Sequence, residues 1–198
     1  MYERADKYTP EEYWKLVEQF PSHKYEYVDG YVRMMTGGSV PHGEISLNIG
    51  AALREALRHS ECHVYSSDVM VRLSEWRCYC PDVSVSCDPH DWTRTKAIEA
   101  PIVIVEVLSP STRHIDTGEK LEAYRRFPTI QEILFADSYR RYVEHYHRLG
   151  QSRWEVTTYE NEQDVIYLPA IEVSLSLSEI YFKVYLEQEE LLEEDETL

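Results

Sequence analysis

The segment PIVIVEVLSPST, residues 101–112, places one carboxylate in a run of aliphatic side chains. From Ile102 to Leu108 every residue except Glu106 is β-branched or aliphatic, which is the composition of a central strand covered on both faces. A carboxylate in such a strand loses hydration, and it needs a cation, a metal ion or strong hydrogen-bond donors beside it. Glu106 is therefore a candidate for chemistry.

Asp82 and Lys120 are further candidates because they lie in the elements next to the Glu106 strand. Asp82 begins the predicted strand PDVSV (81–85), and Lys120 lies in DTGEKLEAY (116–124), which is predicted to be the following helix. If the two strands pair, Asp82 and Glu106 converge at one end of the sheet. Two close carboxylates repel each other unless a divalent cation lies between them, and oxygen ligands completed by water suit Mg²⁺ or Mn²⁺. Asp82 and Glu106 are therefore the predicted metal ligands.

Helix and turn signals predict the elements that hold these residues. Thr9, Pro10 and Glu12 form a capping signature, so a helix is expected to begin at Pro10. Asp29-Gly30 lies at the centre of YEYVDGYVRMM (25–35) and predicts a two-residue hairpin turn. A second amphipathic helix is expected from about His42, and its predicted inward residues are Ile45, Ile49, Ala52, Leu53 and Leu57.

Most of the remaining segments have the composition of strands. Residues 63–73 alternate and are predicted to form one strand. In the strand of residues 101–108, the side chains of Ile102, Ile104, Glu106 and Leu108 are expected to share one face. The expected order is helix, hairpin, helix, three strands, helix and further strands, which predicts a mixed α/β sheet with helices on its faces.

Six segments carry a resemblance to a known family. They are YEYVDG (25–30), PHGEI (41–45), PDVSV (81–85), PIVIVEVLSPST (101–112), DTGEKLEAY (116–124) and QEILFAD (131–137). Through these segments the chain resembles the PD-(D/E)XK superfamily of restriction-endonuclease-like nucleases and, within it, the Uma-two family. VEVLSPST is the most specific part of the resemblance, which covers most of the chain.

The resemblance implies a restriction-endonuclease-like α/β fold, in which a mixed β-sheet core of the order αβββαβ is flanked by helices. It also implies metal-dependent hydrolysis of phosphodiester bonds in DNA, with Mg²⁺ or Mn²⁺ as the cofactor. Asp82, Glu106 and Lys120 would be the catalytic residues. Because double-strand cleavage by this fold usually needs a two-fold dimer, a homodimer is expected.

The chain departs from the superfamily pattern at one position. The E-x-K element would place a lysine two residues after Glu106, where this chain has Leu108. In members of the Uma-two family the lysine comes from the following helix, where this chain has Lys120. One helical turn and a four-carbon side chain are long enough for Lys120 to reach the site. The alternative is that the lysine is lost, and that the protein is a catalytically inactive nuclease-like fold serving as a binding module.

Each candidate also has an ordinary structural interpretation. Asp82 could accept backbone hydrogen bonds at a strand start, Glu106 could pair with Arg125, and Lys120 could be an exposed helix residue. Glu26 and His42 match motif positions of the family and are second-tier candidates for lining the site, with Asp68 as a third. A zinc site at Cys78, Cys80, Cys87 and His90 is disfavoured because it lacks a C-x₂-C knuckle.

Composition limits the remaining possibilities. The 198 residues suffice for one domain, predicted at residues 1–184, followed by an acidic tail at residues 185–198. The net charge of −16 argues against a surface that binds nucleic acid by counterion release alone. No membrane segment and no targeting signal are evident, and four cysteines in a chain of this size suggest reduced thiols, so a cytoplasmic location is expected.

Overall fold

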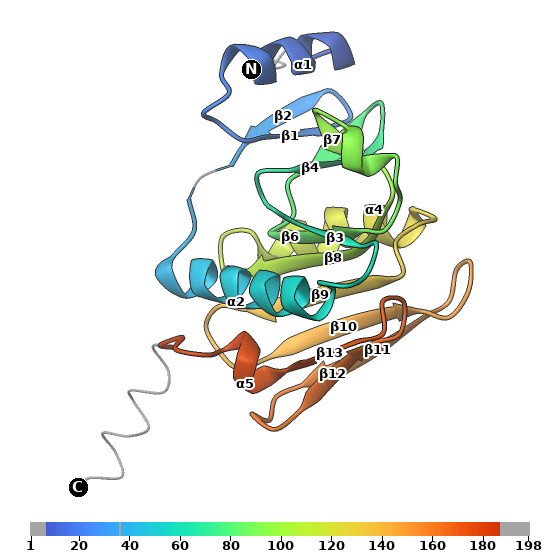
Figure 1. Ribbon diagram of the computed structural model, residues 1–198. Coiled ribbons are helices and arrows are strands. Elements are labelled where there is room, and N and C mark those ends of the chain that lie inside the picture. Colours follow the sequence, from blue (N-terminus) through green and yellow to red (C-terminus); the bar gives the residue numbers. More distant parts are fainter. Residues whose placement is uncertain (1–6, 36, 187–198) are drawn as a thin grey trace, which may run out of the picture.

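A computed structural model describes residues 7–35 and 37–186 (Figure 1). Its largest sheet has six strands in the order β11-β10-β9-β8-β6-β3. These strands are β3 (His63–Ser66), β6 (Val83–Ser86), β8 (Pro101–Leu108), β9 (Glu132–Asp137), β10 (Val143–Arg148) and β11 (Trp154–Tyr159). Strands β8 and β9 are parallel and the other neighbours are antiparallel, so the sheet is mixed, as predicted.

Helices cover both faces of this sheet. Helix α2 (Val40–Ala56) buries Ile45, Ile49 and Leu53 against the side chains of one face. On the other face, α3 (Arg113–Ile115), the π-helical turn η2 (Asp116–Lys120) and α4 (Leu121–Arg126) form one continuous segment, which buries Ala123 and Tyr124. The alternation of the β8 side chains explains this arrangement, because both faces of the strand are apolar.

A second sheet carries the N-terminal part of the chain, in the order β2-β1-β5-β4-β7. Its strands are β1 (Tyr25–Val28), β2 (Tyr31–Met34), β4 (Met70–Ser74), β5 (Arg77–Tyr79) and β7 (Ala97–Ile98). Helix α1 (Pro10–Gln19) has the predicted capping box at Thr9 and stacks Tyr13 on Tyr27, with ring centroids 4.7 Å apart. Asp29 and Gly30 take positive φ angles of 50° and 95° in the β1–β2 turn, which confirms the predicted hairpin.

The C-terminal part packs below the large sheet in Figure 1. It contains the hairpin of β12 (Val165–Leu168) and β13 (Val173–Ser176), followed by α5 (Leu177–Ile180). A short 3₁₀ turn, η1 (Asp91–Thr93), connects β6 to β7. Most of the predicted acidic tail, residues 187–198, lies outside the described residues.

The structure corrects three predictions. Residues 63–73 are not one strand, because a turn after Ser66 divides them into β3 and β4, which belong to different sheets. Ile102 packs with the face opposite to Glu106, because the β6–β8 register shifts near Ser86 and the alternation changes there. The expectation of four reduced thiols is wrong, since Cys62 and Cys87 form a disulfide and leave Cys78 and Cys80 free.

A buried carboxylate fastens the β12–β13 hairpin to the large sheet. Glu132 is fully buried, and its oxygens accept hydrogen bonds from Ala170 N–H at 2.9 Å and contact the rings of His145 and His147 at 2.7 Å and 3.0 Å. Hydrogen bonds to a buried charged group stabilise the fold more than neutral ones do.

We predict that Glu132→Gln lowers the free energy of unfolding by about 1–3 kcal/mol, because a neutral amide cannot accept all these hydrogen bonds. Urea denaturation measures the change. The exposed Glu155→Gln on β11 is a matched control and should change stability by less than about 0.5 kcal/mol. Equal effects of the two substitutions would contradict this role for Glu132.

Candidate functional site

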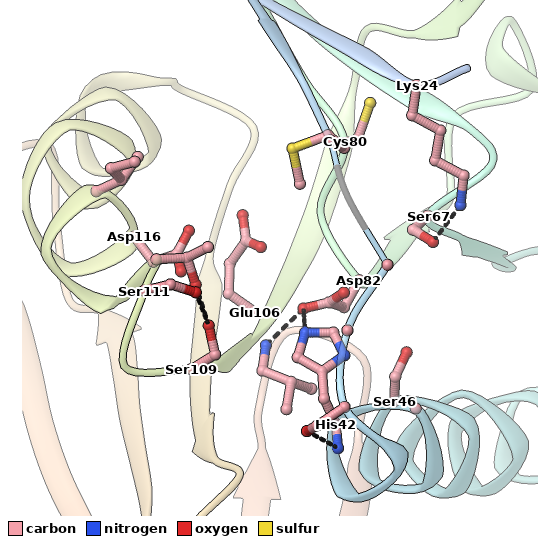
Figure 2. A pocket seen from close by; sticks show the side chains of 18 of the residues that line it. Lys24, His42, Ser46, Ser67, Cys80, Asp82, Glu106, Ser109, Ser111 and Asp116 are labelled. Atoms are coloured by element: carbon pink, nitrogen blue, oxygen red, sulfur yellow. Dashed lines mark hydrogen bonds and ion pairs between the residues drawn. The ribbon is translucent and has the colours of Figure 1, made fainter.

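A cavity of about 500 Å³ opens beside the end of β8. Its walls come from β1, the start of α2, the β5–β6 connection, the turn after β8 and the η2 turn. Figure 2 shows Glu106 and Asp116 pointing into this space from one side and His42 from the other. The cavity thus collects five of the six candidates, namely Glu26, His42, Asp82, Glu106 and Lys120.

Asp82 reaches the cavity because β6 pairs with β8. Their antiparallel register places Val83 opposite Val105, so Asp82 lies beside the last residues of β8. Its Oδ2 accepts a hydrogen bond from Val107 N–H at 2.7 Å and lies 3.4 Å from His42 Nε2. The predicted pairing of the two strands is confirmed, and the ordinary role of a backbone hydrogen bond accounts for one of the two oxygens.

Glu106 is buried and has two donors on one of its oxygens. Its Oε1 accepts hydrogen bonds from Lys120 Nζ at 3.1 Å and from the Tyr124 hydroxyl at 2.6 Å. The side chain of Glu106 is only 4% exposed, but it forms part of the cavity wall. Its cationic partner is therefore Lys120 and not Arg125.

Lys120 is buried among three carboxylates. Its Nζ lies 2.9 Å from Glu26, 3.1 Å from Glu106 and 3.1 Å from Asp116. The spacing of Asp116 and Lys120, four residues apart in the η2 turn, places both on the same side of the helical segment. The prediction that Lys120 reaches the Glu106 carboxylate from the following helix is confirmed, and the interpretation of Lys120 as an exposed residue is wrong.

Glu26 connects this cluster to the second sheet. Its Oε1 also accepts a hydrogen bond from Cys80 N–H, and its Oε2 lies 3.3 Å from Arg33, which pairs in turn with Glu119. Arg33 is the cross-strand neighbour of Glu26 in the β1–β2 hairpin. The third candidate of the second tier, Asp68, is not a wall residue, because it forms an exposed ion pair with Lys24.

Asp116 and Arg33 are site residues that the sequence analysis did not single out. Both had a signal. Asp116 precedes Lys120 by one helical turn, and Arg33 is opposite Glu26 once the hairpin turn at Asp29-Gly30 fixes the register.

The cavity has more negative than positive side chains. Burial raises the pKa of Glu106 well above its ordinary value; Lys120 opposes this rise, and the carboxylates of Asp116, Asp82 and Glu26 add to it. Burial alone would lower the pKa of Lys120, but Glu106, Glu26 and Asp116 together raise it, so its ammonium stays charged. A hydrogen bond to Asp82 raises the pKa of His42. This charge distribution favours the uptake of a proton or of a further cation.

One oxygen of each predicted metal ligand remains available. Neither Oδ1 of Asp82 nor Oε2 of Glu106 receives a hydrogen bond from residues 7–35 or 37–186. Across those same ranges, no group of three or more His, Cys, Asp or Glu side chains is arranged to hold a metal ion. Mg²⁺ is commonly bound by one or two carboxylates and several water molecules. The available oxygens of Asp82 and Glu106 therefore fit a hydrated Mg²⁺ or Mn²⁺ ion, and not a metal ion held by protein ligands alone.

The cysteines of the described residues do not form a metal site either. Cys87 is bonded to Cys62, and Cys78 and Cys80 are buried thiols, whose pKa values are raised by burial. A zinc site at Cys78, Cys80, Cys87 and His90 therefore has no support in the described part of the chain.

Comparisons with known proteins identify the family to which this chain belongs. A family model with the description "Putative restriction endonuclease", named Uma2 (Uma-two), matches residues 10–179. The chain belongs to the Uma2 family. The match spans most of the chain and includes Glu26, Asp82, Glu106 and Lys120.

Two curated relatives come from Synechocystis. The uncharacterized protein slr1290 is 35% identical over 176 residues, which is 88% of this chain and 92% of that protein. The uncharacterized protein sll1609 is 30% identical over 152 residues, or 75% of this chain and 85% of that protein.

A solved structure shows the same fold as this Uma2 chain. It is the crystal structure of "a putative nuclease belonging to DUF820" from Anabaena variabilis, which superposes with a TM-score of 0.70 at 17% identity. The superposition covers 87% of this chain and 97% of the other. The predicted restriction-endonuclease-like α/β fold is therefore confirmed, and the family membership makes the protein nuclease-like.

Among residues 7–35 and 37–186, no helix is both long enough and apolar enough to cross a membrane.

Proposed function

We propose that this protein is a Mg²⁺- or Mn²⁺-dependent DNA endonuclease, which hydrolyses phosphodiester bonds in the cavity beside β8. One observation carries the proposal: Asp82, Glu106 and Lys120, from three separate elements, face one cavity whose wall has four carboxyl groups. Membership of a family described as "Putative restriction endonuclease" supports it.

Asp82 and Glu106 would hold the ion through Oδ1 and Oε2. When bound, such an ion polarises the phosphate and lowers the pKa of a bound water, which makes a nucleophile available at neutral pH. The chain keeps the two carboxylates oriented, because Val107 N–H and His42 fix Asp82 while the Tyr124 hydroxyl fixes Glu106. Such preorientation reduces the cost of assembling the site.

Lys120 would neutralise charge that develops on the scissile phosphate. In the described structure its ammonium contacts three carboxylates, so an incoming phosphate oxygen has to replace one of them. Glu106 is the one that would be released, because its charge would be shared with the ion. Glu26 and Asp116 would then keep Lys120 in place.

Cleavage of labelled oligonucleotides in the presence of Mg²⁺ or Mn²⁺ tests the proposal. We expect activity that chelation with EDTA abolishes and that Asp82→Asn lowers strongly. Asp68→Asn is a matched control outside the cavity and should retain full activity. Absence of cleavage under all conditions, from protein of verified fold, would contradict the proposal and favour the alternative of an inactive nuclease-like binding module.

We predict that the affinity for Mg²⁺ falls as the pH falls. Because the pKa of Glu106 is raised, the ion must displace a proton from this carboxyl at low pH, and the affinity should decrease up to about tenfold for each pH unit below that pKa. Calorimetry in two buffers of different ionisation enthalpy measures the proton release. An affinity independent of pH between 5 and 8, with no proton released, would contradict a role of Glu106 in binding.

A further inference from the structure

The groups proposed for the reaction lie at the floor of the cavity. The side chains of Glu26, Glu106, Lys120 and Asp116 are 0%, 4%, 3% and 5% exposed, whereas Asp82 is 16% exposed. A phosphodiester can therefore meet Glu106 and Lys120 only if it enters the cavity. A phosphate that stays at the protein surface would not reach them.

The size of the cavity limits what can enter. Its volume of about 500 Å³ lies within the range of about 300–1,000 Å³ that small-molecule pockets have. A DNA duplex has grooves that admit a whole helix, and its backbones are held apart by base pairs. A cavity of this volume can take in a short piece of one strand, whereas a paired segment would have to lie across its mouth.

The cavity wall provides neutral hydrogen-bond donors, and the lysine and arginine side chains that line it are already paired with carboxylates. Six serine and threonine side chains line the cavity, those of Ser39, Ser46, Ser67, Ser109, Ser111 and Thr112. Its cationic residues have acidic partners, since Lys24 pairs with Asp68, Arg33 with Glu26 and Glu119, and Lys120 with three carboxylates. Duplex binding by counterion release needs many phosphate contacts to Lys and Arg, so this cavity is poorly suited to it.

An exposed aromatic ring completes the wall. Tyr139 follows β9, is 41% exposed and borders the cavity. Aromatic rings on which bases stack are a recurring device for holding single strands, and duplexes do not present free base faces to them.

We propose that the substrate is a single unpaired DNA strand or flap, which enters the cavity with one base stacked on Tyr139. This inference rests on the nuclease function proposed for the same site. It makes the predicted homodimer unnecessary for the reaction, because cleavage of one strand uses one cavity.

Binding and cleavage of three matched oligonucleotides test the inference: a single strand, its duplex, and a duplex with a 5′ flap of the same sequence. Fluorescence anisotropy with Ca²⁺ in place of Mg²⁺ measures binding, and gel assays with Mn²⁺ measure cleavage. The single strand and the flap should bind and be cut at least tenfold better than the duplex. Tyr139→Ala should weaken single-strand binding by about tenfold or more, which is the scale of one lost base-stacking contact.

Tyr167→Ala is the matched control, because Tyr167 is an exposed tyrosine on β12 outside the cavity wall, and it should bind single strands as the wild type does. Equal or better binding and cleavage of the duplex would overturn the inference while leaving the nuclease function in place. If the Tyr139→Ala protein binds single strands normally, stacking of a base on Tyr139 is not part of substrate binding. Failure to bind or cut any of the three DNAs would overturn both the inference and the proposed function.

Discussion

Replacement of Lys120 by alanine is expected to lower the free energy of unfolding by about 3–5 kcal/mol at neutral pH. The ammonium of Lys120 lies within 3.1 Å of Glu26, Glu106 and Asp116, and all four side chains are buried. Removing it takes the cation away from the buried carboxylates of Glu106 and Asp116, while Glu26 keeps Arg33. The deficit should shrink toward pH 5, because protonation then removes the uncompensated charge.

Urea denaturation at pH 5 and pH 8 measures this effect. Lys15→Ala on the exposed side of α1 is a suitable control and should change stability by less than about 0.5 kcal/mol. At temperatures where the Lys120→Ala protein remains folded, we also expect Mg²⁺-dependent cleavage to fall by about 10²-fold or more, the scale of one lost charge stabiliser. A folded variant with full activity would show that Lys120 has only a structural role.

Glu106→Gln is expected to change stability and activity in opposite directions. Glutamine has nearly the shape of the protonated acid and keeps a carbonyl oxygen for the Tyr124 hydroxyl, so the fold should tolerate it. It cannot supply the anionic oxygen that we propose for the ion, and cleavage should fall by about 10³-fold or more.

The direction in which the stability difference changes with pH follows from the raised pKa of Glu106. The folded-state pKa of Glu106 is raised above its unfolded value, so the wild type loses stability as the pH rises from the unfolded value of about 4.3 through the folded one. Glutamine removes that loss, and thermal denaturation should find the variant more stable than the wild type at pH 8, with little difference near pH 4. Exposed Glu122→Gln serves as the control. A Glu106→Gln protein that is less stable at pH 8 than the wild type would show that ionised Glu106 is needed to hold Lys120.

Much of the fold could be predicted because local signals dominate it. The capping residues of α1, the Asp29-Gly30 turn and the apolar face of α2 each depend on a few neighbouring residues. The division of residues 63–73 could not be predicted in this way, since the alternation continues through the turn and only pairing with β6 and β5 separates the two strands. The Cys62–Cys87 disulfide likewise depends on the pairing of β3 with β6.

The residues of the candidate site could be predicted from the sequence, but the contacts among them could not. Glu106 was recognisable as a carboxylate in an apolar strand, and the pairing of β6 with β8 brings Asp82 beside it. The sequence does not show that Lys120 is buried among three carboxylates, and it therefore suggests that Lys120→Ala would barely affect stability. Burial of this ammonium depends on the β1–β2 hairpin, which brings Glu26 to the η2 turn from almost a hundred residues away.

The proposed function depends most on an ion held between Asp82 and Glu106. The most direct measurement is an anomalous-difference map from crystals of the protein soaked in Mn²⁺. We predict a peak in the cavity beside β8, within about 2.0–2.2 Å of an oxygen of each carboxylate, with water in the remaining positions. A map without a peak at Asp82 and Glu106, at Mn²⁺ concentrations that saturate hydrated carboxylate sites, would contradict the account.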